Sequence, residues 1–284
     1  MSTPEQFIAL KDRTDRGTAA APLDIVFTND LDFSEISDFE GLGNAVLYAN
    51  INGNGYAIKN LTANSSGAFY LISRVSNGTI KNITIDNCHI TTSGSLYIFY
   101  SQLCNYENIV IKNNNTFVSL NEMHVIYSAS NSGITVTKVA VGGTYNCNKY
   151  FGLYLGSSSP SKISNCYVVA NITCNNICHT FGYINGCEGV FNCFTRCNIT
   201  NTSAKGTYYG FCYSYSKVKT FYCYAANQIS GSFSTYYNLG NNLTATSCFY
   251  DSTLDTSPQN GEGLPATTSQ LKSAEWLRSQ GWAI

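Results

Sequence analysis

Short segments in which apolar and polar residues alternate recur along most of this chain. A clear example is Ile80-Lys81-Asn82-Ile83-Thr84-Ile85, and seven other six-residue segments have a similar pattern. Their third residues, used as reference points for an alignment, are Asn60, Asn82, Asn108, Lys138, Asn165, Asn192, Thr220 and Ser247. Neighbouring reference points are 22 to 30 residues apart, which indicates a structural repeat of about 27 residues.

A second kind of short segment lies between the first ones. Examples are Tyr97-Ile98-Phe99-Tyr100-Ser101 and Gly210-Phe211-Cys212-Tyr213-Ser214. Alternation with a period of two residues is typical of a strand that is buried on one side. Since one turn of two or three such strands cannot bury its own apolar side, the turns must stack. We therefore predict an all-β fold, a right-handed parallel β-helix (solenoid) of about eight coils, with short helical caps at both ends.

Stacked turns place equivalent residues in columns. We expect Ile80, Val136 and Ile163 to point inward and to share one column. We also expect a structural asparagine column that bonds one turn to the next, formed by Asn60, Asn82, Asn108, Asn165 and Asn192. Lys138 cannot continue this ladder and predicts a local irregularity. The inward fourth position holds Cys166, Cys193 and Cys248, with Phe221 between the last two.

The two ends of the chain have a different pattern. Thr3 or Ser2 followed by Pro4 predicts the start of a short helix, and residues 24–32 read as the first strand. A helix is expected over residues 269–280, with Trp276 and Trp282 packed together in a cap. We therefore divide the chain into an N-terminal cap (1–45), β-helix repeats (46–250) and a C-terminal loop and helical cap (251–284).

Charge and cysteine content narrow the class of protein. The net charge is −1 and only 12% of residues are charged, so we expect no nucleic-acid partner. No apolar run is long enough to span a membrane and the first residues do not resemble a signal peptide, so no membrane insertion is expected. The 12 cysteines recur at repeat positions, which favours buried reduced thiols over disulfides.

The residues that could carry chemistry are sparse in the repeats. Between Asn60 and Asp251 the acidic residues are Asp86, Glu107, Glu122 and Glu188, and none shares a slot with another in a neighbouring turn, as a glycosidase pair would require. The three histidines, His89, His124 and His179, also fall in different slots. A metal site at Cys174, Cys178 and His179 is the weaker alternative, because the spacing lacks the paired pattern of zinc sites. We predict no catalytic residues, no metal and no cofactor.

Tyrosine is the most conspicuous residue of the repeats, with 21 in the chain. Outward tyrosines can hold sugar rings or form a protein interface; the alternative is that many face inward or only shield the strands. The candidate surface-binding aromatics are Tyr97, Tyr100, Tyr127, Tyr154, Tyr183 and Tyr209, and Tyr167, Tyr208, Tyr222 and Tyr224 occupy slots of the same kind.

Several strings of this chain resemble the GLUG-repeat β-helix proteins. They include Ala49-Asn50-Ile51-Asn52-Gly53-Asn54-Gly55-Tyr56, Gly78-Thr79-Ile80-Lys81-Asn82 and Ile163-Ser164-Asn165-Cys166-Tyr167. The likeness extends in order over nearly the whole chain, although Phe99 and Ile126 stand where the family usually has glycine. The resemblance implies a right-handed β-helix of bacterial surface adhesins or of bacteriophage tail and virion proteins, without universal catalytic residues.

The resulting hypothesis is a non-catalytic structural or surface-binding module, most consistent with a tail-associated or receptor-binding protein of a bacteriophage or phage-like particle. It would be made in bacterial cytoplasm and located in the virion. Its partners would be other virion or cell-surface proteins and a host surface glycan, and it would form a homo-oligomer such as a trimer. The alternatives are a secreted or surface-located bacterial adhesin and a polysaccharide-degrading enzyme with an intersubunit site.

Overall fold

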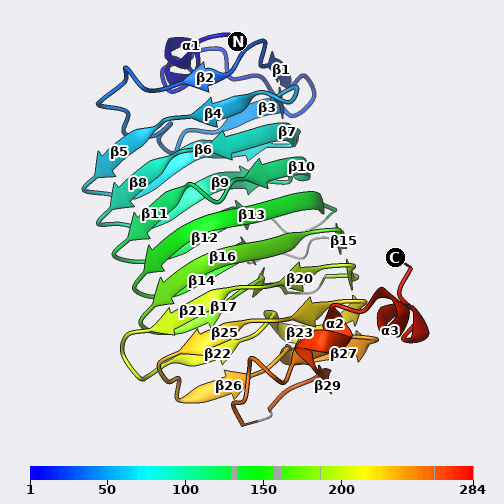
Figure 1. Ribbon diagram of the computed structural model, residues 1–284. Helices are drawn as coiled ribbons and strands as arrows, with labels where there is room; N and C mark the ends of the chain where they lie inside the picture. The colour runs from blue at the N-terminus through cyan, green and yellow to red at the C-terminus, as the bar shows by residue number, and fades with distance from the viewer. Residues whose placement is uncertain (129–132, 157–161, 186, 259, 284) are drawn as a thin grey trace.

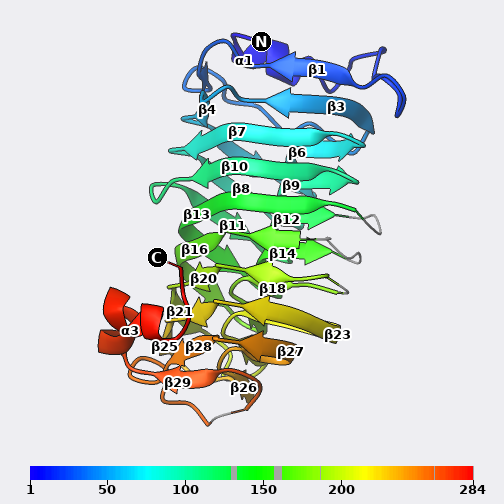
Figure 2. The same ribbon diagram turned by 90° about the vertical axis from the view of Figure 1, so that its right-hand side faces the viewer.

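The computed structural model describes residues 1–128, 133–156, 162–185, 187–258 and 260–283, and for residues 154–156 it describes the backbone alone. In this part of the chain the strands wind into one parallel β-helix of about eight turns (Figure 1). Each strand pairs in parallel with strands one turn away, and the turns stack from the N-terminal to the C-terminal end of the molecule (Figure 2). The predicted fold class is thereby confirmed.

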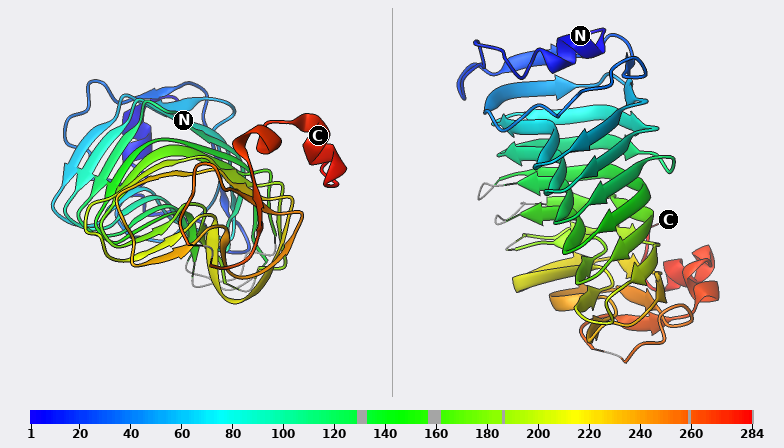
Figure 3. Two further views of the ribbon diagram at one scale, coloured as in Figure 1. Left: turned by 60° about the horizontal axis from the view of Figure 1, so that its bottom comes forward. Right: turned by 90° about the vertical axis from the view of Figure 1, so that its left-hand side faces the viewer.

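One turn contains three main strands that meet at bends and enclose a common interior (Figure 3). A typical turn consists of β7 (Thr79–Asp86), β8 (His89–Thr92) and β9 (Leu96–Gln102), and the next consists of β10 (Asn105–Ile111), β11 (Thr116–Ser119) and β12 (Met123–Ser128). The pairs β7–β10, β8–β11 and β9–β12 define what we call the first, second and third faces.

The remaining strands extend these faces in both directions. They are β1 (Leu23–Val26), β2 (Leu31–Asp32), β3 (Leu47–Asn52), β4 (Ala57–Lys59), β5 (Thr62–Ser65), β6 (Phe69–Ser76), β13 (Thr135–Cys147), β14 (Tyr150–Gly156), β15 (Lys162–Ser164), β16 (Tyr167–Cys174), β17 (Ile177–His179), β18 (Gly182–Tyr183), β19 (Val190–Phe191), β20 (Phe194–Thr195), β21 (Asn198–Asn201), β22 (Thr207–Tyr209), β23 (Cys212–Phe221), β24 (Tyr224–Ala225), β25 (Gln228–Ser230), β26 (Thr235–Tyr237), β27 (Gly240–Thr246), β28 (Phe249–Asp251) and β29 (Leu264–Ala266). Strand β13 runs through both the first and the second face.

Columns of apolar side chains fill the interior. Ile80, Tyr106, Val136 and Ile163 are successive partners in the ladder, and all four are fully buried. The expectation that Ile80, Val136 and Ile163 share one column is confirmed. Because each turn buries its apolar side only against its neighbours, this column is the physical basis of the repeat.

Asparagine side chains link the turns along one bend of the β-helix. Asn82 Nδ2 donates to Asn52 Oδ1, and Asn108 Nδ2 donates to Asn82 Oδ1, each at 2.9 Å. Further along, Asn192 Nδ2 donates to Asn165 Oδ1 at 3.3 Å. These bonds satisfy the polar groups of the bend without placing charge there.

Asn60 belongs to a second ladder, so its predicted alignment with Asn82 is wrong. Ile58 pairs with Ile85 rather than with Ile80, and Asn87 Nδ2 donates to Asn60 Oδ1 at 2.8 Å. The tripeptide Ile-Lys-Asn occurs at residues 58–60 and again at 80–82. The two copies occupy different bends of the turn, which the sequence pattern alone could not distinguish.

The bend of the first ladder requires a left-handed backbone. The φ angles are +55° at Asn82, +53° at Asn108 and +55° at Asn165, a conformation that asparagine tolerates better than most residues. Lys138 adopts the same conformation, with φ +55°, and β13 pairs with β10 on both sides of it. The irregularity expected at Lys138 is therefore absent from the backbone, and only the side-chain ladder changes there.

The alignment is also wrong in the seventh repeat. Phe191 pairs with Phe221, so Tyr222, with φ +54°, is the third residue of this segment instead of Thr220. The inward fourth position is then Cys223, and the ring of Phe221 stacks on that of Phe191 at 5.0 Å. The shift arises because this turn gains three residues between Asn201 and Tyr208: Cys174 pairs with Asn201, 27 residues further on, whereas Cys178 pairs with Tyr208, 30 residues further on.

The N-terminal end is closed by a short helix, α1 (Pro4–Ile8). Thr3 is its N-cap, and the Thr3 side chain accepts a hydrogen bond from the Gln6 amide. Phe7 is fully buried against the first turns. The single strand expected over residues 24–32 is two strands, β1 and β2, because the chain turns between them.

The C-terminal cap contains two helices, α2 (Thr268–Leu271) and α3 (Ala274–Ser279), where one helix over residues 269–280 was expected. The break occurs because the Ser273 side chain accepts a hydrogen bond from the Trp276 amide and so starts a new helix. Trp276 packs on Phe249 and Trp282 packs on Tyr224, with ring centroids 4.9 and 5.9 Å apart. Tyr224 and Phe249 are register partners in adjacent turns, so both tryptophans pack against the same small apolar cluster of the cap.

All twelve cysteines are buried and free. Four of them, Cys166, Cys193, Cys223 and Cys248, occupy the fourth position of successive segments and form one uninterrupted inward column. Burial raises the pKa of several of these thiols, including that of Cys187 to about 11. The expectation of thiols that pack as small apolar side chains is thus met by the structure.

Candidate ligand-binding site

The outer side of the third face carries ten of the 21 tyrosines of the chain. We call this surface the tyrosine face, and its members are Tyr70, Tyr97, Tyr100, Tyr127, Tyr150, Tyr183, Tyr209, Tyr213, Tyr215 and Tyr237, together with His124 and His179. The strand register places Tyr70, Tyr97, His124 and Gly152 in one column. One turn beyond Gly152 the same column continues through His179, Tyr209 and Tyr237.

Stacking between turns orders these rings. The rings of Tyr70 and Tyr97 are 4.9 Å apart and inclined by 5°, and those of Tyr209 and Tyr237 are 4.9 Å apart and inclined by 2°. Such parallel pairs follow from the spacing of adjacent strands, about 4.8 Å. Tyr97 also meets Tyr127 edge to face at 5.3 Å, so neighbouring columns support one another.

Gly152 interrupts the aromatic column. Toward the N-terminal end of the molecule lies a cluster around Tyr97 and His124. Toward the C-terminal end lies a second cluster around His179 and Tyr209, which we call the lower cluster. The ring of Tyr150 bridges toward the lower cluster, 6.3 Å from the ring of His179. The tyrosine face is therefore divided at the turn of β14.

The two histidines of this face are covered by tyrosine rings. His124 is fully buried and His179 is 5% exposed. Burial lowers the pKa of His124, and it lowers the pKa of His179 to about 3. Both rings are therefore neutral near pH 7, and the Nδ1 atom of each has no hydrogen-bond partner among the described residues.

A groove with a volume of about 370 Å³ is hollowed into the lower cluster. Among the described residues it is lined by Glu122, Tyr150, Ile177, His179, Tyr183, Tyr209, Tyr213 and Tyr215. Tyr215 is 70% exposed, and its ring stands at 85° to that of Tyr183 and at 72° to that of Tyr213. Tyr215 lies in the register shift of β23, and an irregularity of this kind redirects a side chain away from the sheet.

Glu122 supplies the carboxylate at one end of the groove. His124 Nε2 donates to Glu122 Oε2 at 3.4 Å, and this hydrogen bond is the main reason that the pKa of Glu122 is lowered. The side chain of Glu122 is 30% exposed, so the ionised carboxylate remains accessible from the groove.

The candidate tyrosines predicted from the sequence do not all lie on this surface. Tyr97, Tyr100, Tyr127, Tyr183 and Tyr209 all belong to the tyrosine face, whereas the side chain of Tyr154 lies outside the part that the structure describes. Tyr208 is fully buried and points inward. Tyr167, Tyr222 and Tyr224 lie elsewhere, in ring contacts with Phe194 and Trp282.

Sequence reasoning missed about half of this surface. Tyr70, Tyr150, Tyr213, Tyr215, Tyr237, His124 and His179 were not among the candidates. Tyr70 is the register partner of Tyr97, and Tyr213 is the register partner of Tyr183, so a column-by-column alignment of the second segments would have found both. Tyr215 lies two residues after Tyr213, on the same outward side of β23, and was missed because the segment read from the sequence ended at Ser214.

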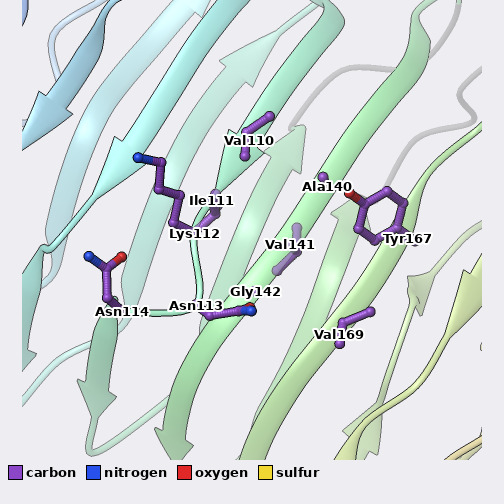
Figure 4. Close-up of a pocket in the computed structure, with 10 residues that line it drawn as sticks. All are labelled: Val110, Ile111, Lys112, Asn113, Asn114, Ala140, Val141, Gly142, Tyr167 and Val169. Atoms are coloured by element: carbon purple, nitrogen blue, oxygen red, sulfur yellow. The ribbon is translucent and has the colours of Figure 1, made fainter.

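A larger groove, with a volume of about 590 Å³, lies on the outer side of β10, β13 and β16 (Figure 4). Its lining is mainly apolar and includes Val110, Ala140 and Tyr167, which are register partners in three successive turns. Tyr167 is 40% exposed.

The same column continues toward the C-terminal end as an aromatic ladder. Tyr167, Phe194 and Tyr224 stack at 5.1 and 5.0 Å, and the cap residue Trp282 covers Tyr224. The ladder is thus covered by the C-terminal cap at one end and open at the other. Of the residues that line this groove, only Tyr167 was noted in the sequence as an outward aromatic.

The described residues contain no group of three or more histidine, cysteine or acidic side chains arranged to hold a metal ion. In the same part of the chain no helix is both long and apolar enough to cross a membrane. Comparisons with protein-family models, with curated proteins and with solved structures give no match.

Proposed function

We propose that the protein is a non-catalytic surface-binding module that recognises a glycan of a bacterial surface through the tyrosine face. The observation that carries this proposal is the groove, whose lining is dominated by tyrosine rings over the buried ring of His179. Tyrosine offers apolar ring area together with a hydroxyl group that bonds to sugar hydroxyls. The turns repeat about every 4.8 Å, a spacing close to the length of one sugar unit in an extended glycan.

The placement of acidic residues supports binding over hydrolysis. Asp86 is partnered by Lys59 in one neighbouring turn and forms an ion pair with Lys112 of the next turn at 2.5 Å. Glu122 directly precedes the first paired residue of β12. The equivalent positions in the two adjacent turns hold Ser95, before β9, and Tyr150, at the start of β14. Glycoside hydrolysis uses two carboxylates about 5–10 Å apart. The register gives neither acid a carboxylate in an adjacent turn, and Lys59 lies between Asp86 and the next acid of its column, Asp32.

We place this module in the tail of a bacteriophage or phage-like particle. The resemblance to GLUG-repeat proteins and the twelve buried free thiols support the assignment, because a virion protein is made in a reducing cytoplasm. Mass spectrometry of purified particles tests it: detection of this chain is expected, and its absence from particles that carry complete tails would contradict the location.

Binding is tested with labelled protein on bacterial cells and on arrays of bacterial surface glycans. We expect Tyr183→Ala and Tyr213→Ala each to weaken binding by about tenfold, since each removes a ring from the groove. Tyr167→Ala is the matched control, because this exposed tyrosine lies on another face. Equal binding by all three variants would contradict the tyrosine face as the site.

A further inference from the structure

The ligand groove of the tyrosine face has a defined charge. Glu122 is the ionised residue among its described lining residues, and the others are tyrosines, Ile177 and neutral His179. Burial raises the pKa of Tyr209 to about 12, so this hydroxyl stays protonated. Lys149 adds a weaker Coulombic influence on Glu122 and does not line the groove. The described lining therefore carries one negative charge.

The hydrogen bond between Glu122 and His124 leaves that charge in place. His124 is fully buried and its pKa is lowered, so the ring donates as a neutral imidazole. A neutral donor orients the carboxylate without cancelling its charge. The carboxylate thus remains available as the counter-ion of a bound cation.

The tyrosine rings favour the same kind of ligand. Tyr183 and Tyr213 stack at 5.6 Å, and Tyr215 stands nearly perpendicular to both. Aromatic rings attract organic cations through the negative potential of their faces. His179 lines the same groove as a neutral ring and so adds no positive charge that would repel a cation.

We propose that the groove binds a protonated amine carried on a surface glycan, that is, an amino sugar without its N-acetyl group. Glu122, at one end of the groove, forms the ion pair with the ammonium group, and Tyr183, Tyr213 and Tyr215 hold further sugar units of the same glycan. This inference rests on the proposed glycan-binding function and specifies the chemistry of its ligand. An N-acetylated or anionic sugar lacks the ion pair, and an anionic one is repelled by the carboxylate.

The test uses two tetrasaccharides with one backbone, β-1,4-linked glucosamine and β-1,4-linked N-acetylglucosamine, in titration calorimetry at pH 6. We expect the free amine to bind at least about tenfold more tightly than the acetylated sugar. Glu122→Gln should abolish this preference, because the amide can still accept from His124 but carries no charge. Glu107→Gln, a change at an exposed acid of β10, is the matched control and should leave the preference unchanged.

The wild-type protein provides a second measurement that does not depend on a variant folding correctly. Raising the salt concentration should weaken binding of the amine and leave that of the acetylated sugar nearly unchanged. Equal affinities for the two sugars, or a preference that persists in Glu122→Gln, would overturn the inference. If neither tetrasaccharide binds while cells are still bound through Tyr183 and Tyr213, only the ligand chemistry is wrong. If no cell or glycan is bound, the proposed function fails as well.

Discussion

His179 illustrates how an aromatic surface changes the chemistry of a residue that it covers. The rings of Tyr209 and Tyr213 lie 4.8 and 5.8 Å from the imidazole ring and displace the water that would stabilise its charged form. Burial is therefore the main cause of the lowered pKa, with a smaller repulsion from His124. A histidine in this column behaves as a flat neutral ring, like the tyrosines of the adjacent turns.

This burial predicts a loss of stability in acid. The pKa of His179 falls from 6.5 in the unfolded chain to about 3 in the folded protein, so the unfolded state binds more protons between these values. The free energy of unfolding should therefore decrease as the pH falls below 6.5. Relative to His179→Tyr, the wild-type protein should lose about 2 kcal/mol between pH 7 and pH 5, measured by urea unfolding.

The Tyr replacement is a suitable control, because Tyr209 already occupies the same column one turn away. Parallel pH curves for the two proteins would show that His179 is not held neutral by burial.

At the residue scale, the sequence predicted the site only in part. Tyr97, Tyr127 and Tyr183 were identified because they lie in strands whose alternation is regular. His124 and His179 were treated as unrelated, although they occupy one column on either side of Gly152. Their relation depends on turns of unequal length, and the length of each turn is fixed by packing rather than by a local pattern.

Among the elements, the bend at the first asparagine ladder is the most demanding. It needs a backbone with positive φ and a side chain that bonds to both neighbouring turns. Asparagine meets both requirements, whereas glycine meets only the first and alanine meets neither.

Substitutions at Asn82 should separate these two contributions. Asn82→Gly keeps the backbone conformation and loses the ladder bonds, so the free energy of unfolding should fall by about 1 kcal/mol. Asn82→Ala adds the cost of a left-handed backbone and should lower it by about 2–3 kcal/mol. Chemical denaturation measures both values, and equal effects of the two substitutions would mean that backbone strain at the bend is negligible.

The elements were predictable where the pattern was local. The alternation of residues 80–85 predicted a strand, and β7 spans Thr79–Asp86. The alignment failed at Asn60 and at Tyr222 for different reasons. A repeated tripeptide concealed the bend to which Asn60 belongs, and three extra residues between Asn201 and Tyr208 displaced the segment around Tyr222.

For the whole molecule, the stacking of turns determines which groups can react. All twelve thiols are buried in a continuous interior, so a thiol reagent should modify few of them in the native protein. After unfolding, the reagent should detect close to all twelve. Titration with an aromatic disulfide reagent, before and after addition of denaturant, measures the difference. Rapid reaction of most thiols under native conditions would contradict the stacked core.

The β-helix as a whole followed from the period of the sequence, because a solenoid repeats one interaction along its axis. What the period could not indicate was where the regular surface is hollowed. The groove of the tyrosine face depends on β23, and the groove at Val110 and Tyr167 lies where β13 continues past the end of β10. Both arise from departures from the average repeat.

The inward file of Cys166, Cys193, Cys223 and Cys248 has a consequence for the durability of the protein. Adjacent strands are about 4.8 Å apart, which falls within the range of Cα separations that a disulfide bond can span, about 4.4–6.8 Å. In a strongly oxidising environment, the crosslinks Cys166–Cys193 and Cys223–Cys248 would each fasten two consecutive windings to one another. Unwinding of the oxidised chain would then require a reductant as well as heat.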